Sequence, residues 1–190
     1  MTSKVQNVQK PRKGGLLVAL VGAIAATGLF VSVPLEESGR VQRAEVSAAG
    51  DVVTTHVSGP EHRTAYRDIV GVLTICDGDT ANVKVGQVET RAGCQARLER
   101  QLLAHAEPVM ACIPQLGQPG RDYQRWAAVS LAYNIGTSGA CGSSMARHFR
   151  AGRWRQGCDA ILMWNRAGGK VVRGLTLRRE RERAICLRGL

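Results

Sequence analysis

The sequence predicts an α+β fold in which a small lobe of β-hairpins precedes a larger helical lobe, with a cleft between the two. Three observations lead to this order. An uncharged apolar run occupies residues 14–35, short β-branched stretches follow up to residue 76, and helical periodicity begins near Thr90. We expect the apolar run to form a helix ahead of the folded part. The 190 residues leave room for one compact domain plus this short appendage.

The apolar run is long enough to cross a bilayer as a helix. Basic residues precede it, and this charge order predicts that segment 1–13 is a cytoplasmic end and segment 14–35 an anchor. A cleavable signal peptide is the alternative, but no clear small-residue cleavage site follows closely. Glycines and alanines dilute the run, so it could also leave the membrane again. The basic residues are Lys4, Lys10, Arg12 and Lys13.

The net charge of +11 and the pI near 10.1 indicate a polyanionic partner, which could be nucleic acid, an anionic membrane or an anionic cell wall. No nucleic-acid-binding motif or phosphate loop accompanies the basic residues, so nucleic acid is disfavoured. The six cysteines contain no C-x-x-C pair, which argues against a zinc site. All six follow the apolar run, on the side where an oxidising compartment would favour disulfides.

Two β-hairpins are expected before the helices. The first joins the β-branched stretches 41–47 and 51–58. The second joins 64–66 to 69–76 and turns near Asp68. Together they make the small lobe.

Apolar periodicity and capping residues predict helices in the rest of the chain. The last helix carries a mixed charge run over residues 178–183, which we interpret as a solvated face with alternating ion pairs. The first helix follows a Thr90 cap and places Leu98, Leu102, Ala106 and Val109 on one face; the others are expected from Asp122 to Gly136, from Ser143 or Ser144 to Gly152, from Trp154 to Trp164, and from Thr176 to Leu187.

Asp68 and Thr74 are the first candidates for chemistry. They place a carboxylate at a tight turn and a hydroxyl six residues later on the returning strand. The even spacing could put both on one face, where Thr74 could position a water or support Asp68. On the local pattern alone, an Asp that favours a turn and a Thr that favours a strand is the simpler interpretation.

Other catalytic patterns are weak. Asp77-Gly78-Asp79 begins like a calcium loop, but Asn82 and Val88 break that pattern, so a surface turn is expected. The four histidines show neither metallohydrolase spacing nor a serine-hydrolase partner motif. We therefore expect no metal and no cofactor.

Three ordered blocks cover the chain from about Thr64 to its end: Ala65 to Cys76, Ala128 to Gly136, and Trp164 to Lys170 with its continuation through Gly174-Leu175 and 178–182. Together they resemble the phage-type lysozymes, glycoside hydrolase family twenty-four, and particularly their branch with a signal-anchor segment. The resemblance implies a lysozyme-like fold and a muramidase. Such an enzyme hydrolyses the β-1,4 bond between N-acetylmuramic acid and N-acetylglucosamine in peptidoglycan, with inversion at the anomeric carbon.

In that family a Glu at a helix end, an Asp and a Thr make the active site. The motif match gives Asp68 and Thr74 the last two roles, within a catalytic domain of residues 36–190. The Glu does not match by spacing, because the position nine residues before Asp68 is Gly59.

We favour Glu37 as the acid. The run from Glu37 to Arg40 resembles the family's Glu-Gly-x-Arg turn, which would make 41–58 an inserted hairpin. Glu36 and Glu61 are the alternatives. The acid would protonate the leaving oxygen, while Asp68, with Thr74, would orient the attacking water.

The resemblance also implies a location and a framework of disulfides. The protein would be a monomer held in the inner membrane, facing the periplasm and open to release, and while 14–35 is inserted Glu37 could not easily be placed against Asp68. The lysozyme-like fold could pair Cys76 with Cys94, Cys112 with Cys141, and Cys158 with Cys186.

Two other functions remain open. The irregular glutamate position makes a wall-binding scaffold without turnover the main alternative, in which the fold and anchor are kept. A cationic protein that disrupts membranes is the third, because the pI is high and the last helix is basic.

Overall fold

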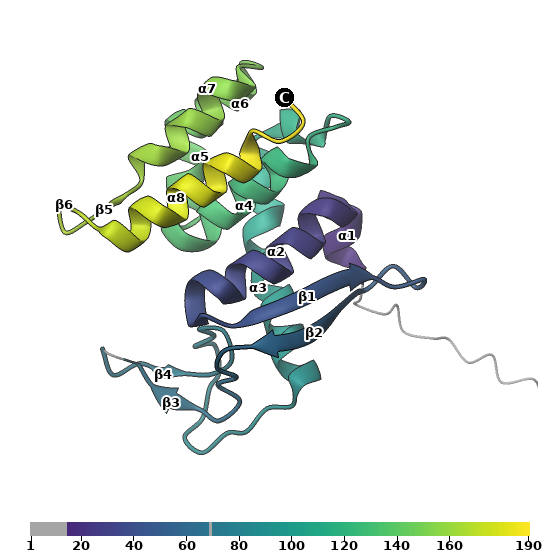
Figure 1. The fold of residues 1–190 in the computed structure, drawn as a ribbon, viewed down its shortest axis with the longest axis vertical. Helices are drawn as coiled ribbons and strands as arrows, with labels where there is room; N and C mark the ends of the chain where they lie inside the picture. Colours follow the sequence, from purple (N-terminus) through teal and green to yellow (C-terminus); the bar gives the residue numbers. More distant parts are fainter. Residues whose placement is uncertain (1–14, 69) are drawn as a thin grey trace, which may run out of the picture.

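A computed structural model describes residues 15–68 and 70–190, so the predicted basic segment 1–13 lies outside the described residues. The predicted α+β arrangement is confirmed, with β-hairpins at one end and a bundle of helices at the other (Figure 1). The helices are α1 (Leu16–Val21), α2 (Ala23–Ser38), α3 (Arg91–Cys112), α4 (Asp122–Ile135), α5 (Thr137–Gly142), α6 (Ser144–Arg150), α7 (Trp154–Ala160) and α8 (Arg173–Cys186), with 3-10 turns at Pro114–Gly117 and Ile161–Met163.

Helix α4 is the centre of the helical lobe. Helices α2, α3, α5 and α8 all pack against it. Its buried residues are mostly small, including Ala127, Ala128 and Ala132, and small side chains let neighbouring helices approach closely. One alanine-rich helix thus allows four other helices to pack closely around it.

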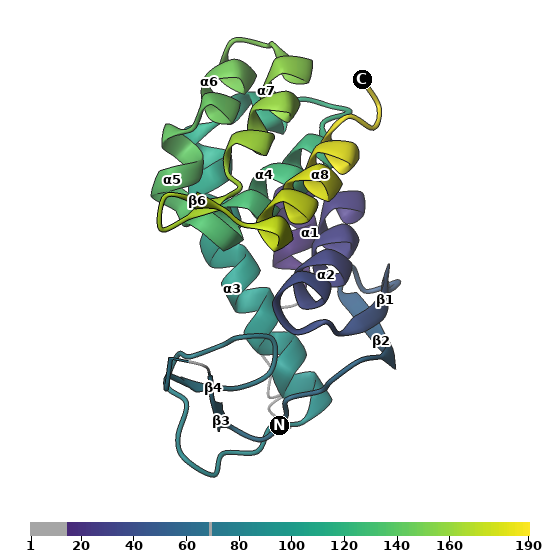
Figure 2. The same cartoon turned by 60° about the vertical axis from the view of Figure 1, so that its left-hand side comes forward.

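Helix α3 joins the two lobes (Figure 2). Thr90 caps it as predicted, because its Oγ1 accepts a hydrogen bond of 2.9 Å from the Gly93 N–H. The predicted apolar face is buried in the core and holds Leu98, Leu102, Ala106 and Val109. One long helix thus connects the β lobe to the bundle.

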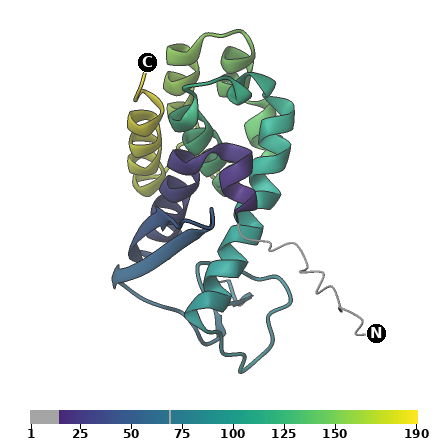
Figure 3. The same ribbon diagram turned by 90° about the vertical axis from the view of Figure 1, so that its right-hand side faces the viewer.

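The apolar run forms two helices, α1 and α2, which break at Gly22 where φ is 86°. Leu17, Leu29, Phe30 and Val33 are completely buried in the main core. The run is therefore part of the helical lobe here, and not a separate helix ahead of it (Figure 3). Over residues 15–68 and 70–190, neither these helices nor any other combines the length and apolarity required of a membrane span.

The first predicted hairpin is confirmed as β1 (Val41–Val46) paired antiparallel with β2 (Val52–Ser58). It lies across α2 and α3. The Gln42 amide donates to the Phe30 carbonyl, and Gln95 of α3 donates to the Val52 carbonyl and accepts from Thr54. The hairpin is thus fixed to the helical body at both strands.

The second predicted hairpin is confirmed as β3 (Tyr66–Arg67) and β4 (Leu73–Thr74). A third one, β5 (Arg166–Ala167) with β6 (Lys170–Val171), occupies the stretch where only a helix break was expected. Gly168 and Gly169 both have positive φ and form its turn. The three expected disulfides are present: Cys76–Cys94, Cys112–Cys141 and Cys158–Cys186.

Some helix ends differ from the prediction. Ser143 caps α6 as one of the two expected candidates, but Asp122 lies inside α4 and pairs with Arg125 at 3.1 Å instead of capping. Helix α8 begins at Arg173, before the predicted Thr176, because Val172 is the last extended residue after β6. Local helix propensity and capping patterns therefore did not predict the N-cap of α4 or the start of α8.

Gly28 generates a stability prediction, because a Cβ at this position would lie 2.4 Å from Trp126 Cδ2. The indole is held in place by its hydrogen bond to Ser32, at 2.9 Å. We expect Gly28→Ala to lower the free energy of unfolding by about 1–3 kcal/mol through overpacking. Gly174→Ala in α8 is the matched control, since its Cβ meets nothing within 4 Å, and helix propensity should raise stability by up to about 1 kcal/mol. Urea unfolding of both variants checks this, and equal effects of the two changes would contradict it.

Candidate active site

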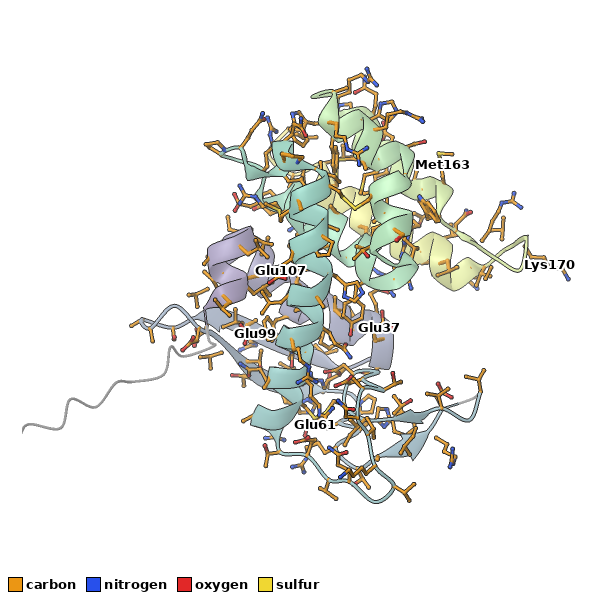
Figure 4. The ribbon with its side chains drawn as sticks, turned by 180° about the vertical axis from the view of Figure 1, so that it is seen from behind. Glu37, Glu61, Glu99, Glu107, Met163 and Lys170 are labelled. Carbon is orange, nitrogen blue, oxygen red and sulfur yellow. A yellow bond between two sulfur atoms is a disulfide. The ribbon has the colours of Figure 1, made fainter. Side chains whose placement is uncertain are left out.

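Glu37 lies in the last turn of α2, above the β3–β4 lobe (Figure 4). The helix ends because Gly39 adopts φ of 73° and its N–H closes back onto the Leu35 and Pro34 carbonyls. A carboxylate at a helix C-terminus faces the negative end of the helix dipole, which is unfavourable unless a cation compensates it. Both glutamates of this turn, Glu36 and Glu37, do meet arginines.

Helix α8 supplies these arginines. Arg178 Nη1 donates to Glu37 Oε1 at 2.8 Å, and Arg181 donates through Nε and Nη2 to both oxygens of Glu36, each at 2.7 Å. Arg178 is buried, whereas half of the Arg181 side chain is exposed. The two ion pairs dock the end of α2 onto α8.

Arg178 also binds a second carboxylate, because its Nε donates to Glu182 Oε1 at 3.3 Å. The same Glu182 oxygen accepts from Ser130 of α4 at 2.7 Å, and Arg179 Nε lies 3.0 Å from the other oxygen. Burial raises the pKa of Glu182, against the opposing effect of Arg179 and Ser130. Burial likewise lowers the pKa of Arg179.

The predicted solvated face of α8 is therefore wrong for half of the charge run. Arg179 is 0% exposed and Glu182 is 2% exposed. The buried side of α8 carries charge because α2 and α4 supply partners for it, including the Asn134 side-chain oxygen, which accepts from Arg179 at 2.9 Å. Arg181 and Arg183 keep exposed side chains as expected, but their partners, Glu36 and Asp159, lie outside the charge run.

Asp68 lies directly after β3, where its side chain shapes the hairpin turn. Its Oδ1 accepts from the Val70 N–H at 3.0 Å and from the Val72 N–H at 2.8 Å. Its backbone N–H donates to the Val72 carbonyl, and Gly71 takes a positive φ of 85°. These bonds fix the orientation of the carboxylate at the turn.

Thr74 is the last residue of β4 and pairs across the hairpin with Tyr66. Its side chain is buried, and its hydroxyl donates to the Val72 carbonyl at 3.1 Å. The structure thus brings Asp68 and Thr74 together on one hairpin. The end of α2, which carries Glu37, is joined to this hairpin by contacts between residues that follow Glu37 and a residue that follows Thr74.

The link runs through Asp77, three residues beyond Thr74. Ser38 Oγ donates to Asp77 Oδ1 at 3.0 Å, and Arg40 Nε donates to the same oxygen at 2.9 Å. Asp79 in the same loop binds Arg97 and Arg100 of α3, and both aspartates are buried. The expected surface turn is therefore wrong, because Arg40, which follows α2, and the two arginines of α3 cover these carboxylates.

Tyr133 of α4 lies in the same neighbourhood. Its hydroxyl donates to Gln101 of α3. Burial raises the pKa of the Tyr133 hydroxyl, and the negative charges of Glu37 and Asp77 raise it further. Helix α4 therefore contributes an uncharged hydroxyl near the end of α2.

Glu61 has a different environment. It accepts three hydrogen bonds from Arg91, at 2.9–3.1 Å, and lies outside any helix. The hydrogen bond from Arg91 holds the pKa of Glu61 below its ordinary value, against a smaller effect of burial. A carboxylate bound in this way remains ionised at neutral pH.

Sequence reasoning missed Arg178, Glu182 and Asp77 as parts of this site. The spacing on α8 offered no signal, because residues 178, 181 and 182 are neighbours on the helix surface whether that surface is buried or solvated. Over residues 15–68 and 70–190, no group of histidine, cysteine or acidic side chains could hold a metal ion. The chemistry that this arrangement offers is that of carboxylates and a hydroxyl.

Comparison with known proteins identifies the family. The phage lysozyme family model matches residues 59–182. A SAR-endolysin of Enterobacteria phage P21 is 38% identical over 125 residues, covering 65% of this chain and 74% of that protein. A SAR-endolysin of Bacteriophage PS119 is 33% identical over 152 residues, covering 80% and 89%.

Solved structures agree with these relatives. The active form of P1 phage endolysin Lyz superposes with a TM-score of 0.60 at 28% identity, covering 67% of this chain and 76% of that one. A P22 lysozyme variant gives a TM-score of 0.58 at 30% identity, covering 67% and 88%. With the family match, the relatives and the fold in agreement, this chain belongs to the phage lysozyme family and is a glycoside hydrolase that degrades peptidoglycan.

Proposed function

We propose that Glu37 is the general acid of this muramidase and that Asp68, with Thr74, orients the attacking water. The observation that carries the assignment is the position of Glu37 at the end of α2, bound by Arg178 and joined through Ser38 and Asp77 to the hairpin. Hydrolysis of a glycosidic bond requires one carboxyl that donates a proton and one carboxylate that activates water. The family leads us to expect inversion at the anomeric carbon.

The competing glutamates fit the role of acid less well. Both oxygens of Glu36 are occupied by Arg181, and Arg91 keeps Glu61 ionised. Glu37 accepts its ion-pair hydrogen bond through Oε1 from Arg178, and that arginine is shared with Glu182. The other oxygen of Glu37, Oε2, accepts no hydrogen bond among the described residues, whereas both oxygens of Glu36 and of Glu61 are bound. This argument favours Glu37 among the three.

Replacement of the three glutamates tests the acid. We expect Glu37→Gln to slow the clearing of purified peptidoglycan by about 10²–10⁴-fold, the usual contribution of a general acid. Glu36→Gln and Glu61→Gln are the matched controls and should clear within a few-fold of the parent protein. Clearing by Glu37→Gln at the parental rate would disprove the assignment. No clearing by the parent protein itself would instead favour the wall-binding scaffold.

Asp68→Asn tests the second carboxylate without removing the turn. An asparagine side-chain oxygen can still accept from the Val70 and Val72 N–H groups, so the hairpin should fold normally. Without the negative charge, the amide cannot activate water, and we expect a loss of about 10²–10⁴-fold in clearing. Circular dichroism and the thermal midpoint should match the parent. Lysis that does not depend on Asp68 would point to membrane disruption.

The stability of the Glu61–Arg91 pair should depend on pH. Because the pKa of Glu61 is below its ordinary value of 4.5, the pair stabilises the fold fully above that value. The contribution disappears as the pH falls through the lowered pKa, where Glu61 becomes protonated. Urea unfolding should therefore find the parent more stable than Glu61→Gln at pH 7, and the difference should shrink as the pH falls below 4.5. A difference that persists in acid would contradict the ion pair.

We also propose that residues 14–35 anchor the newly made protein in the inner membrane, with the domain facing the periplasm, until release. The basic residues ahead of the run and the SAR-endolysin relatives support this proposal. Leu29, Phe30 and Val33 are core residues when α2 is packed. They cannot face lipid at the same time, so anchoring and the packed fold exclude one another.

Two positions of α2 outside its fully buried face, one exposed and one partly exposed, allow a test of release. Ala23 is exposed in the packed fold, and the Thr27 hydroxyl binds only the backbone of its own helix. Ala23→Leu with Thr27→Leu makes the run more apolar without changing its buried face. We expect more of this variant than of the parent in the membrane fraction, and delayed lysis after membrane depolarisation. If depolarisation left all of the parent protein in the membrane fraction, release would be disproved.

A further inference from the structure

The loop Ile75–Asp79, which follows β4, is held to α3 at two points. The Cys76–Cys94 disulfide is the first, with a Cα–Cα distance of 5.4 Å. The second is Asp79 Oδ2, which accepts from Arg97 Nη1 at 2.8 Å and from Arg100 Nη2 at 3.0 Å. Backbone bonds between Ile75 and Asp79 close the loop in both directions, at 2.9 and 3.0 Å. The loop is therefore held firmly against α3.

Asp77 lies between these anchors and binds a different helix. Its Oδ1 accepts from Ser38 at 3.0 Å and from Arg40 Nε at 2.9 Å, and its Oδ2 accepts from Arg40 Nη2 at 2.5 Å. The Asp77 side chain is only 5% exposed. Ser38 is the residue after Glu37. One buried carboxylate thus connects the turn that carries Glu37 to the loop that begins after Thr74.

Gly59 holds the same turn from another direction. A Cβ at this position would lie 2.4 Å from the Gly39 carbonyl oxygen and 3.0 Å from Arg40 Cα. The chain that returns from β2 therefore packs backbone to backbone against the residues that follow Glu37. Residues 38–40 are therefore contacted from two sides, by Gly59 and by Asp77.

We infer that Asp77 is a positioning residue, which fixes Glu37 relative to Asp68 and Thr74 through Ser38 and Arg40. The inference rests on the proposed role of Glu37 as the acid. Without Asp77, the end of α2 would be tied to α8 but no longer to the hairpin loop. A displacement of about 1 Å between reacting groups can lower a rate by about 10²-fold. Asp77 touches no reacting atom in this proposal, so substrate binding should change little.

The test compares Asp77→Asn with Asp79→Asn, measuring kcat and KM on soluble, uncrosslinked glycan chains. Both changes remove one buried carboxylate from the same loop, but only Asp77 reaches α2. In Asp77→Asn the remaining oxygen can still accept from Ser38, but the NH2 group that replaces Oδ2 cannot accept from Arg40 Nη2, so the two-point pair with Arg40 is lost. We expect this change to lower kcat by about 10- to 100-fold, with KM within about twofold of the parent. Asp79→Asn should lower the thermal midpoint and leave kcat within about threefold. Equal losses of kcat in both variants, or a loss confined to KM, would overturn the proposal.

A double-mutant cycle identifies the path of coupling. Because Arg40 acts through Asp77, adding Arg40→Ala to Asp77→Asn should reduce kcat by no more than about twofold further. Additive losses would show independent roles and contradict the inference. Ser38→Ala, which leaves the Arg40–Asp77 pair intact, is the second variant if Asp77→Asn does not fold; a several-fold loss of kcat is expected, and none would count against positioning.

Glu37→Gln in the same assay separates this inference from the proposed function. If Glu37→Gln is inactive and Asp77→Asn retains the parental kcat, the positioning role fails while the acid assignment stands. If Glu37→Gln retains the parental kcat, the acid assignment fails, and the positioning role, which presupposes it, fails with it.

Discussion

The rest of the site depends on Arg178, a buried cation shared by Glu37 and Glu182. A buried charge without a partner is strongly destabilising, so each member of this cluster requires the others to be in place. The partners come from three helices, because Glu37 belongs to α2, Arg178 to α8, and Ser130, which donates to Glu182, to α4. Charge compensation therefore makes the packing of these helices specific, whereas apolar packing alone would tolerate small shifts. The same arginine offsets the unfavourable position of Glu37 at the end of a helix.

This dependence ties the apolar run to the site. The buried face of α2 and its acidic end are consecutive parts of one helix, so Phe30 and Val33 enter the core in the same event that brings Glu37 to Arg178. If the run is held in a bilayer first, the site is incomplete for a physical reason. Glu37 then lacks its cation, Arg178, and Ser38 and Arg40 lack Asp77. Release and assembly of the site would then be one folding step, with no separate switch.

Features set by local pattern could be predicted from the sequence, and features set by distant partners could not. The Thr90 cap and both early hairpins follow from residues within a few positions of one another. The burial of Arg178 depends on Glu37, 141 residues away, and nothing in the run of alternating charges distinguishes a buried face from a solvated one. Likewise, the sequence favours Glu37 over Glu36 and Glu61 only through the resemblance of the run from Glu37 to Arg40 to the family's turn. The three glutamates differ in structure because Arg91 and Arg181 each bind one of them fully, while Arg178 divides itself between two carboxylates.

The hairpin β1–β2 lies between Glu37, the proposed acid, and Asp68 along the chain. The chain leaves the end of α2 after Arg40 and returns beside it at Gly59, whose backbone touches Gly39. Residues 41–58 fit there because the two ends of this segment lie side by side. Closing such a loop costs little entropy, and neither flank has to move. The hairpin buries its own inner face on α2 and α3, so it brings no unpaired strand into the site. Spacing along the sequence is lost, and the family match begins only at Gly59, yet the turn that carries Glu37 still contacts the loop after Thr74 through Asp77. If residues 41–58 are an insertion, as the sequence led us to expect, contact geometry and not residue spacing is what the insertion preserves.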